Sequence, residues 1–373
     1  MNAGRVRHLY VHLPFCASRC GYCDFVTLVG RPGEHGRYVD AVLTELELER
    51  GRLADGVETV FVGGGTPTFT EPAELRRLLE ALPAAAEVTV EANPETVTPE
   101  LAALLRDAGV TRVSLGAQSF EPRLLEVLDR RARPEDVRRA FYHLRDANFD
   151  NINLDLIYGI PGQEPSDLER DLDEALALGP EHLSCYELEA KPGTRFTHAH
   201  GEELARQAES MEGYFELVVE TLIEAGYRWY ETANFCREDR RARHNLAYWL
   251  GHDYLGLGMG AVSTVHGLRW RNLPALPRYL AALASGESPP RELEPLATST
   301  QTQERLMLGL RLDDPLPLAQ VQAALDLEAL ARLERLGLVE RQGDALLLTR
   351  RGRFLGGGVT AELLAEFPAN NYN

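Results

Sequence analysis

The sequence predicts an α/β fold built on a parallel sheet, because two patterns agree. Short apolar segments alternate six times with amphipathic helical segments over the first half of the chain. This alternation is typical of parallel strands joined by right-handed helical crossovers. Polar residues also follow the ends of several strands, as expected where one mouth of the sheet carries a site. Six such units would form either an open doubly wound sheet or an incomplete barrel.

The expected strands are short, rich in β-branched or aromatic residues, and bounded by turn residues. Thr98 and the pair Ser166-Asp167 are typical helix N-caps, and Gly109 lies where the third helix should end. The predicted strands cover residues 8–13, 59–64, 87–93, 112–119, 152–159 and 182–189. The predicted helices cover residues 38–50, 71–82, 98–108, 121–130, 134–147 and 166–178.

The second half of the chain follows a different pattern. One long helix is expected over 202–225, ending at Gly226, and 287–295 reads as a linker. The tail predicts short helices and a hairpin turned at 342–344, which together indicate a winged-helix-like module. We therefore expect three domains: a partial barrel (1–200), a helical and strand extension (201–290) and a winged-helix-like C-terminal domain (291–373).

Composition excludes several functional classes. A chain of 373 residues exceeds the size of a single core, so more than one domain is expected. The net charge of −18 argues against sequence-independent nucleic-acid binding, which needs cationic groups. We expect neither a membrane span nor a signal peptide, because the long apolar stretches that these need are absent. Five cysteines, three of them clustered, suggest free thiols in a reducing cytoplasm.

Three cysteines on one loop predict a metal centre. Cys16, Cys20 and Cys23 have Cys-x3-Cys-x2-Cys spacing, and Phe25 follows where a fourth thiol would fit. This spacing differs from that of structural zinc sites, whereas a cubane iron–sulfur cluster held by three thiolates keeps one iron open. The alternatives are a buried cysteine trio, or a zinc site completed by His12. Strand-end residues would face the same mouth: the "GGGTPT" segment (63–68), Glu91, Gln118 and Asp155.

The cysteine loop resembles that of the radical S-adenosylmethionine (radical SAM) enzymes. Together with "GGGTPT", "NLDLIYGIPGQ", "YETANF" and "HNLAYW", it resembles the oxygen-independent coproporphyrinogen oxidase family, and within it the branch of heme chaperones. The resemblance implies an incomplete (β/α)6 TIM-like radical SAM barrel, an α+β extension and a C-terminal winged-helix-like module. It also implies a [4Fe-4S] cluster on Cys16, Cys20 and Cys23, with S-adenosylmethionine (SAM) bound at the open iron.

The resemblance assigns further roles by position. Tyr10 and Tyr22 match SAM-contacting aromatics, and Gly64, Gly65 and Thr66 match the segment that meets the methionine moiety. The branch usually reads Leu-Gly-Arg-x-His where this chain reads Leu128-Asp129-Arg130-Arg131-Ala132, so either arginine could be the equivalent. The polar SAM contacts implied are Glu91, Gln118, Arg130 and Asp155.

The "HNLAYW" segment places His244 and Tyr248 on one helical face. The residues alone favour a packed helix, whereas the resemblance implies that His244 contacts heme. Cys185 and Cys236 are expected to be packing residues.

The expected function is that of a heme chaperone that binds heme and delivers it to heme-accepting respiratory proteins. The rival is an enzyme that decarboxylates coproporphyrinogen III. The oxidase branch has a cysteine at the position of Phe25 and an N-terminal extension, both of which this sequence lacks, so coproporphyrinogen oxidation is disfavoured. A DNA-binding role for the wing is disfavoured by the acidity. We expect a cytoplasmic protein, with peripheral membrane contact left open.

Overall fold

The largest sheet of the computed structural model, which describes residues 4–190 and 195–365, has nine strands. Their order is β11-β1-β4-β5-β6-β7-β8-β10-β9. Strands β11 to β8 in this order are parallel, and β10 and β9 are antiparallel. Within the described residues β11 and β9 are the sheet edges, so the barrel is incomplete, as predicted. The strands are β1 (His8–Leu13), β4 (Val57–Gly64), β5 (Ala85–Ala92), β6 (Arg112–Gln118), β7 (Ile152–Tyr158), β8 (His182–Glu187), β9 (Arg228–Glu231), β10 (Asn234–Cys236) and β11 (Leu255–Leu257).

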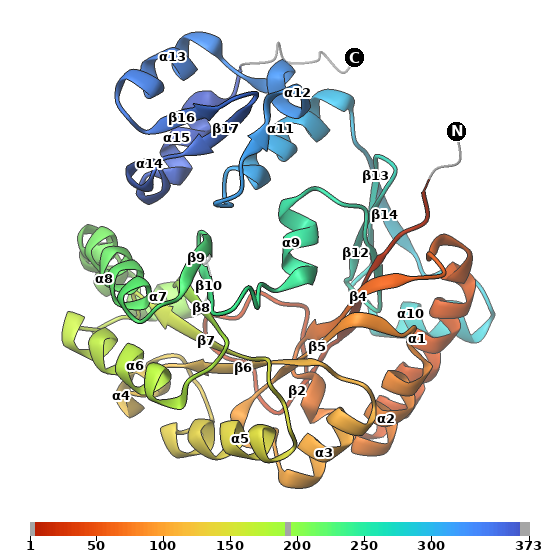
Figure 1. Cartoon of the computed structure of the whole chain (residues 1–373). Coiled ribbons are helices and arrows are strands. Elements are labelled where there is room, and N and C mark those ends of the chain that lie inside the picture. The colour runs from red at the N-terminus through yellow and green to blue at the C-terminus, as the bar shows by residue number, and fades with distance from the viewer. Residues whose placement is uncertain (1–3, 191–194, 366–373) are drawn as a thin grey trace.

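Helices connect the parallel strands and lie around the outside of the curved sheet (Figure 1). The Thr98 side chain accepts a hydrogen bond from the Leu101 amide, which confirms the predicted cap. The predicted cap at Ser166 is wrong, because α6 begins at Pro165 and its capping box pairs Glu164 with Asp167. The helices are α1 (His35–Glu49), α2 (Pro72–Ala81), α3 (Pro99–Asp107), α4 (Pro122–Val127), α5 (Pro134–Asp146) and α6 (Pro165–Leu178). Short 3-10 helices cover Pro32–Glu34, Arg50–Arg52, Pro67–Phe69 and Pro94–Thr96.

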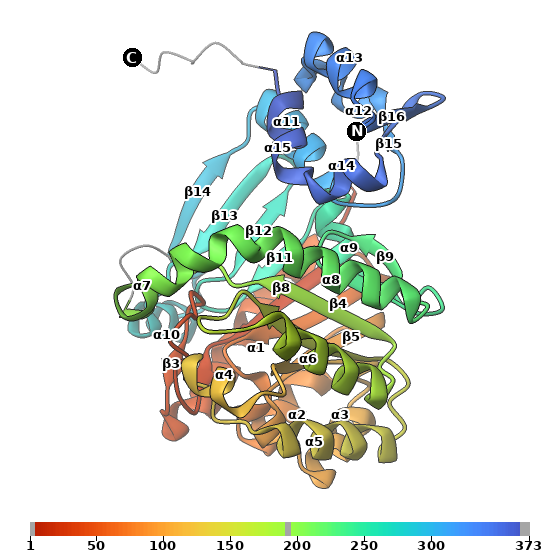
Figure 2. The same ribbon diagram turned by 90° about the vertical axis from the view of Figure 1, so that its left-hand side faces the viewer.

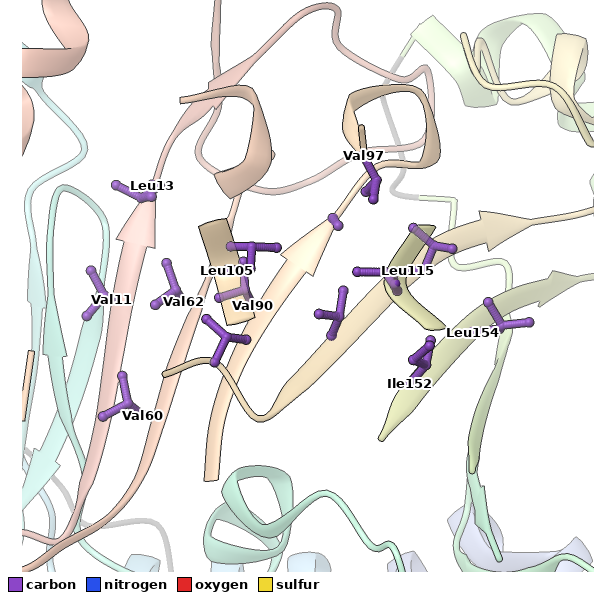
Figure 3. Packing of buried hydrophobic residues seen from close by; sticks show 14 of the residues in the cluster. Val11, Leu13, Val60, Val62, Val90, Val97, Leu105, Leu115, Ile152 and Leu154 are labelled. Carbon is purple, nitrogen blue, oxygen red and sulfur yellow. The ribbon is translucent and has the colours of Figure 1, made fainter. Parts of the chain in front are cut away.

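Alternation along the strands gives the sheet an apolar outer face and a polar inner face. Val11, Val62 and Val90 are fully buried register partners on β1, β4 and β5 (Figure 3). The inner face instead carries buried polar side chains that are hydrogen-bonded to one another or to the segment that crosses the barrel interior. These are His8, Thr59, Glu87, Ser114, Asn153 and His182. The sheet therefore presents a wall of polar groups to the inside of the barrel.

The prediction of one continuous helix over 202–225 is wrong, because this segment forms two helices. The chain forms α7 (Arg195–Gln207) and α8 (Met211–Glu224), separated by a 3-10 turn at Ala208–Ser210. The predicted end at Gly226 is confirmed, since its φ of 84° is the left-handed conformation that commonly follows a helix.

The central segment places a helix inside the incomplete barrel and adds a second sheet. Helix α9 (Arg243–Trp249) carries the "HNLAYW" residues and lies on the inner side of the main sheet (Figure 1). The second sheet has the order β12-β13-β14. The linker predicted over 287–295 is therefore wrong in part, because β14 pairs with β13. The additional elements are β12 (Val262–Val265), β13 (Leu268–Asn272), α10 (Leu276–Ala284) and β14 (Arg291–Pro295).

The C-terminal segment has an apolar cluster of its own, separate from the barrel core. Its sheet has the order β15-β17-β16, and the predicted hairpin turn at 342–344 is confirmed. Figure 2 shows it on the opposite side of the molecule from α2, α3 and α5. Its elements are α11 (Thr298–Gly309), β15 (Leu316–Pro317), α12 (Leu318–Val321), a 3-10 helix (Gln322–Ala324), α13 (Leu327–Arg335), β16 (Val339–Gln342), β17 (Ala345–Leu348), α14 (Arg350–Phe354) and α15 (Gly356–Leu363). No helix in the described ranges is long and apolar enough to cross a membrane.

Candidate functional site

The cysteine loop leaves the carboxyl end of β1 and is framed by two very short strands. Strand β2 (Phe15–Cys16) pairs in parallel with β3 (Leu28–Val29), so the loop begins and ends on paired backbone. The Thr66 amide donates a hydrogen bond of 2.8 Å to the Phe15 carbonyl. The loop is thereby fixed against the segment that follows β4, as the position of both at strand ends predicts.

The three thiols lie close enough to affect one another electrostatically. Burial raises the pKa of Cys16, and the neighbouring Cys20 and Cys23 raise it further. The Thr66 hydroxyl lies 3.5 Å from the Cys16 sulfur and donates to it. No three His, Cys, Asp or Glu side chains within the described ranges converge on a point that could hold a single metal ion. A cubane cluster does not require such convergence, because each thiolate binds a different iron.

His12 does not serve as a free fourth ligand. Its Nε2 lies 2.8 Å from the Val26 carbonyl oxygen and its Nδ1 lies 3.0 Å from the Tyr10 hydroxyl. Burial lowers the pKa of His12 to about 4, so the ring is neutral near pH 7. His12 therefore links the first strand to the far side of the cysteine loop, and the zinc alternative loses its candidate ligand.

The glycines at the end of β4 allow a close approach between backbone and site. A Cβ on Gly65 would lie 2.9 Å from the Cys16 sulfur and 2.6 Å from the Pro14 carbonyl oxygen. Gly64 has a φ of 115°, a conformation that side chains disfavour, and its amide donates a hydrogen bond of 3.0 Å to Glu91. The triplet is thus required by the contact between this segment, the cysteine loop and Glu91.

Two carboxyl groups with raised pKa values, Glu91 and Asp155, lie inside the barrel. Burial raises the pKa of Glu91 to about 7, and the charge of Asp155 adds to the effect. Burial also raises the pKa of Asp155, although Asn153 and Ser114 donate hydrogen bonds of 2.8 and 3.2 Å to it. Since the charge of Asp155 disfavours ionisation of Glu91, a cationic ligand bound near them would be attracted.

The structure places Arg130, and not Arg131, at the cysteine loop. Nη1 of Arg130 lies 3.8 Å from the Cys20 sulfur, and Nη2 donates hydrogen bonds of 2.7 Å to Gly116 and 3.1 Å to Asn93. Its Nε is buried without a hydrogen-bond partner within the described ranges. The Arg131 side chain is exposed. An anionic group bound here would meet a partly desolvated guanidinium, so the residues present fit a cluster with a carboxylate-bearing ligand.

The remaining predicted contacts surround this point. Gln118 has a φ of 66° and lies at an irregularity in the pairing of β6 with β7, which turns its side chain back toward Gly116. The Tyr10 ring stacks on Phe61. Tyr22 packs against a small apolar cluster, and the nearby Arg130 charge influences its pKa, although burial has the largest effect and raises it.

Sequence reasoning missed Asn93, Ser114 and Asn153, which hold Arg130 and Asp155 in place. A signal for two of them was present. Asn93 is two residues from Glu91, and Asn153 is two residues from Asp155. Because side chains alternate along a strand, such pairs share the inner face.

His244 on α9 is buried inside the barrel, and both of its ring nitrogens have partners. Nδ1 lies 2.7 Å from the Thr59 hydroxyl, and Nε2 lies 2.7 Å from the Tyr248 hydroxyl. The side chain is fully buried, and burial lowers its pKa to about 3. In this arrangement neither nitrogen is free for heme iron, so heme contact by His244 stays a prediction that the geometry does not favour. Cys185 and Cys236 are buried in β8 and β10, away from the cysteine loop.

Comparisons with known proteins agree with this geometry. The radical SAM superfamily profile matches residues 10–175, and the HemN C-terminal domain profile matches residues 299–355. "Heme chaperone HemW" of Mycobacterium tuberculosis is 40% identical over 370 residues, which cover 95% of this chain and 94% of the relative. That of Bacillus subtilis is 32% identical over 379 residues, which cover 97% of this chain and all of the relative.

A solved structure shares the fold. Coproporphyrinogen III oxidase (HemN) from Escherichia coli, described as a radical SAM enzyme, aligns with a TM-score of 0.79. The alignment covers 96% of this chain and 90% of that one, at 23% identity. The relatives named heme chaperone HemW are 40% and 32% identical over nearly the whole chain, and the radical SAM profile matches its barrel, so the chain belongs to the HemW family within the radical SAM superfamily.

Proposed function

We propose that this protein binds heme and inserts it into acceptor proteins, while carrying a [4Fe-4S] cluster and SAM at the barrel mouth. The relationship to proteins named heme chaperone, over nearly the whole chain, carries the proposal. Respiratory proteins are the proposed acceptors. A reducing cytoplasmic location is proposed as well, because the five cysteines are all free thiols.

The residues at the mouth support the binding of the cluster and SAM. Cys16, Cys20 and Cys23 would hold the cluster, which when bound supplies an open iron that chelates the amino and carboxylate groups of SAM. Arg130 would attract the carboxylate, and Glu91 would attract a cationic part of the ligand. Gln118 and Asp155 would accept hydrogen bonds from ribose hydroxyls.

Oxidation of coproporphyrinogen is the second candidate, favoured by the fold shared with HemN. That likeness concerns the fold alone. Phe25 weighs against this candidate, because its side chain is 65% exposed beside the cysteine loop and offers no thiol.

Anaerobic reconstitution followed by two parallel assays tests the proposal. The reconstituted protein should bind heme stoichiometrically, as measured by its absorbance band, and should transfer it to a heme-free acceptor. It should not consume coproporphyrinogen III in the presence of SAM and a reductant. The C16A/C20A/C23A variant is the control for cluster dependence. Sustained SAM-dependent loss of two carboxyl groups from coproporphyrinogen III would favour the oxidase, and absence of heme binding would refute the chaperone proposal.

A further inference from the structure

A cavity of about 650 Å³ lies between the end of α9, the second sheet and α11. Its volume falls within the roughly 300–1,000 Å³ of small-molecule and cofactor sites. Its lining contains neither the cysteine loop nor the glycine segment that follows β4. Part of the wall, including Arg305 and Met307, comes from the region that matches the HemN C-terminal domain. The cavity is therefore a second site, distinct from the barrel mouth.

One imidazole at this cavity is free to bind a metal. His252 is exposed, and no described residue forms a hydrogen bond with its Nε2. Its ring stacks on His8 with centroids 5.4 Å apart, and its Nδ1 lies 3.4 Å from Nε2 of His8. An iron-binding histidine typically uses one ring nitrogen for the metal while a protein group holds the other. His252 meets both conditions, in contrast to His244.

The cavity also has one positive charge without a carboxylate partner. Arg305 donates hydrogen bonds to the Gln320 side chain at 2.8 Å and to the Trp249 carbonyl at 3.2 Å, and to no carboxylate within the described ranges. Two other charged groups that line the cavity already have partners. Arg269 pairs with Glu304, and Asp253 accepts a hydrogen bond of 3.0 Å from the His266 backbone amide. The half-buried Arg305 therefore favours an anionic ligand, since burial lowers its pKa and so disfavours its uncompensated charge.

The walls suit a flat apolar body. Tyr248 and Tyr254 lie edge to face with ring centroids 4.6 Å apart, and Leu296 and Leu308 contribute aliphatic surface. Met307, 48% exposed on α11, adds a thioether to the lining. An iron porphyrin matches these three features, because it combines a flat apolar ring, an iron that can bind an imidazole and carboxylate groups that can pair with an arginine.

We propose that this cavity is the heme site, with His252 as the axial iron ligand and Arg305 as the partner of a heme propionate; this inference rests on the proposed heme-binding function. The buried histidine of the "HNLAYW" segment is then a positioning residue. His244 and Thr59 lie 2.7 Å apart, Thr59 and His8 lie 2.9 Å apart, and His8 contacts His252. This chain of contacts holds the exposed His252 ring in its orientation from the buried side.

Heme titration of full-length variants tests the assignment. In H252A the heme absorbance band should shift and affinity should fall by at least about tenfold, and added imidazole should restore the band. In R305Q affinity should fall while the band keeps its position, because the iron ligand is intact. Heme dimethyl ester lacks the propionate charges, so it should bind wild type as weakly as heme binds R305Q. R305Q should bind heme and heme dimethyl ester with the same affinity.

Matched controls are the exposed His198→Ala on α7 and Arg335→Gln on α13, which lie outside the cavity lining. Iron–sulfur content and thermal unfolding should match wild type in all four variants, since His252 is exposed and Arg305 forms no ion pair with any described residue. If wild type binds heme but H252A and R305Q retain its spectrum and affinity, the cavity assignment is wrong and the proposed function stands. If wild type binds no heme, both are wrong.

Discussion

Nη1 of Arg130 lies 3.8 Å from the sulfur of Cys20, and its Nη2 donates a hydrogen bond to Gly116 on the neighbouring strand end. The guanidinium is thus held between the cysteine loop and the carboxyl ends of the strands. Arg131, the next residue, directs its side chain to solvent. The two arginines form a natural pair for comparison.

Arg130→Ala should weaken SAM binding by about 1.5–3 kcal/mol, the value of a hydrogen bond to a charged group. Arg131→Ala should leave SAM affinity unchanged, because an exposed side chain makes no such contact. Isothermal titration of the reconstituted protein measures both. Loss of affinity in the Arg131 variant alone would reverse the assignment.

Replacing any one of Cys16, Cys20 and Cys23 by Ala should abolish a stable cubane cluster, because two thiolates leave two irons unheld. Cys185→Ala and Cys236→Ala should keep wild-type iron and sulfide content. Both of these thiols are buried, and burial raises the pKa of Cys236 to about 11, which disfavours the thiolate. Chemical analysis of the five variants decides the ligand set, and a Cys236 variant without a cluster would contradict it.

SAM affinity should depend on pH through Glu91. Burial raises the pKa of this carboxyl to about 7, so below pH 7 the free protein holds a proton that a cationic ligand must displace. The dissociation constant should therefore rise about tenfold per pH unit below 7 and become flat above it. Glu91→Gln should bind SAM weakly at every pH, with a flatter profile. A wild-type profile without this dependence would remove Glu91 from the site.

The sequence was sufficient for the parallel part of the fold, because each of β1, β4, β5, β6, β7 and β8 is a short apolar run followed by a helix. It was insufficient at the sheet edge. Strand β11 spans only Leu255–Leu257 inside a glycine-rich segment, outside the six strands that the sequence predicts. Three residues carry too little periodicity to indicate a strand, and its pairing with β1 depends on tertiary contacts.

The candidate site was predictable to the extent that its residues lie at strand ends. Topology brings Glu91 and Asp155 together, and alternation could have added Asn93 and Asn153. The choice between Arg130 and Arg131 was not predictable, because it depends on Asp129, whose φ of 55° ends α4 early and redirects the next side chain. The domain boundary predicted before residue 291 falls at the start of β14. Because β14 pairs with β13, this boundary separates two strands of one sheet.

His244 should make the protein sensitive to acid. Its pKa is about 3 in the folded state and near 6.5 when unfolded, so the unfolded chain binds the extra proton between these values. Stability is therefore fully present above about pH 6.5 and is lost as the pH falls. From pH 7.5 to 5 wild type should lose about 2 kcal/mol more than His244→Gln. Denaturant unfolding at the two pH values measures the difference, with the exposed His198→Gln as control.

The parallel pairing of β1 with β11 has a consequence for biosynthesis. Leu9, near the start of the chain, pairs with Leu255, so one edge of the strand that leads into the cysteine loop stays unpaired until the ribosome has released the central segment. Contacts between such distant residues form slowly, and an unpaired strand edge invites association with other chains. The loop therefore gains its full support only late in synthesis, and the nascent protein depends on protection from aggregation until then.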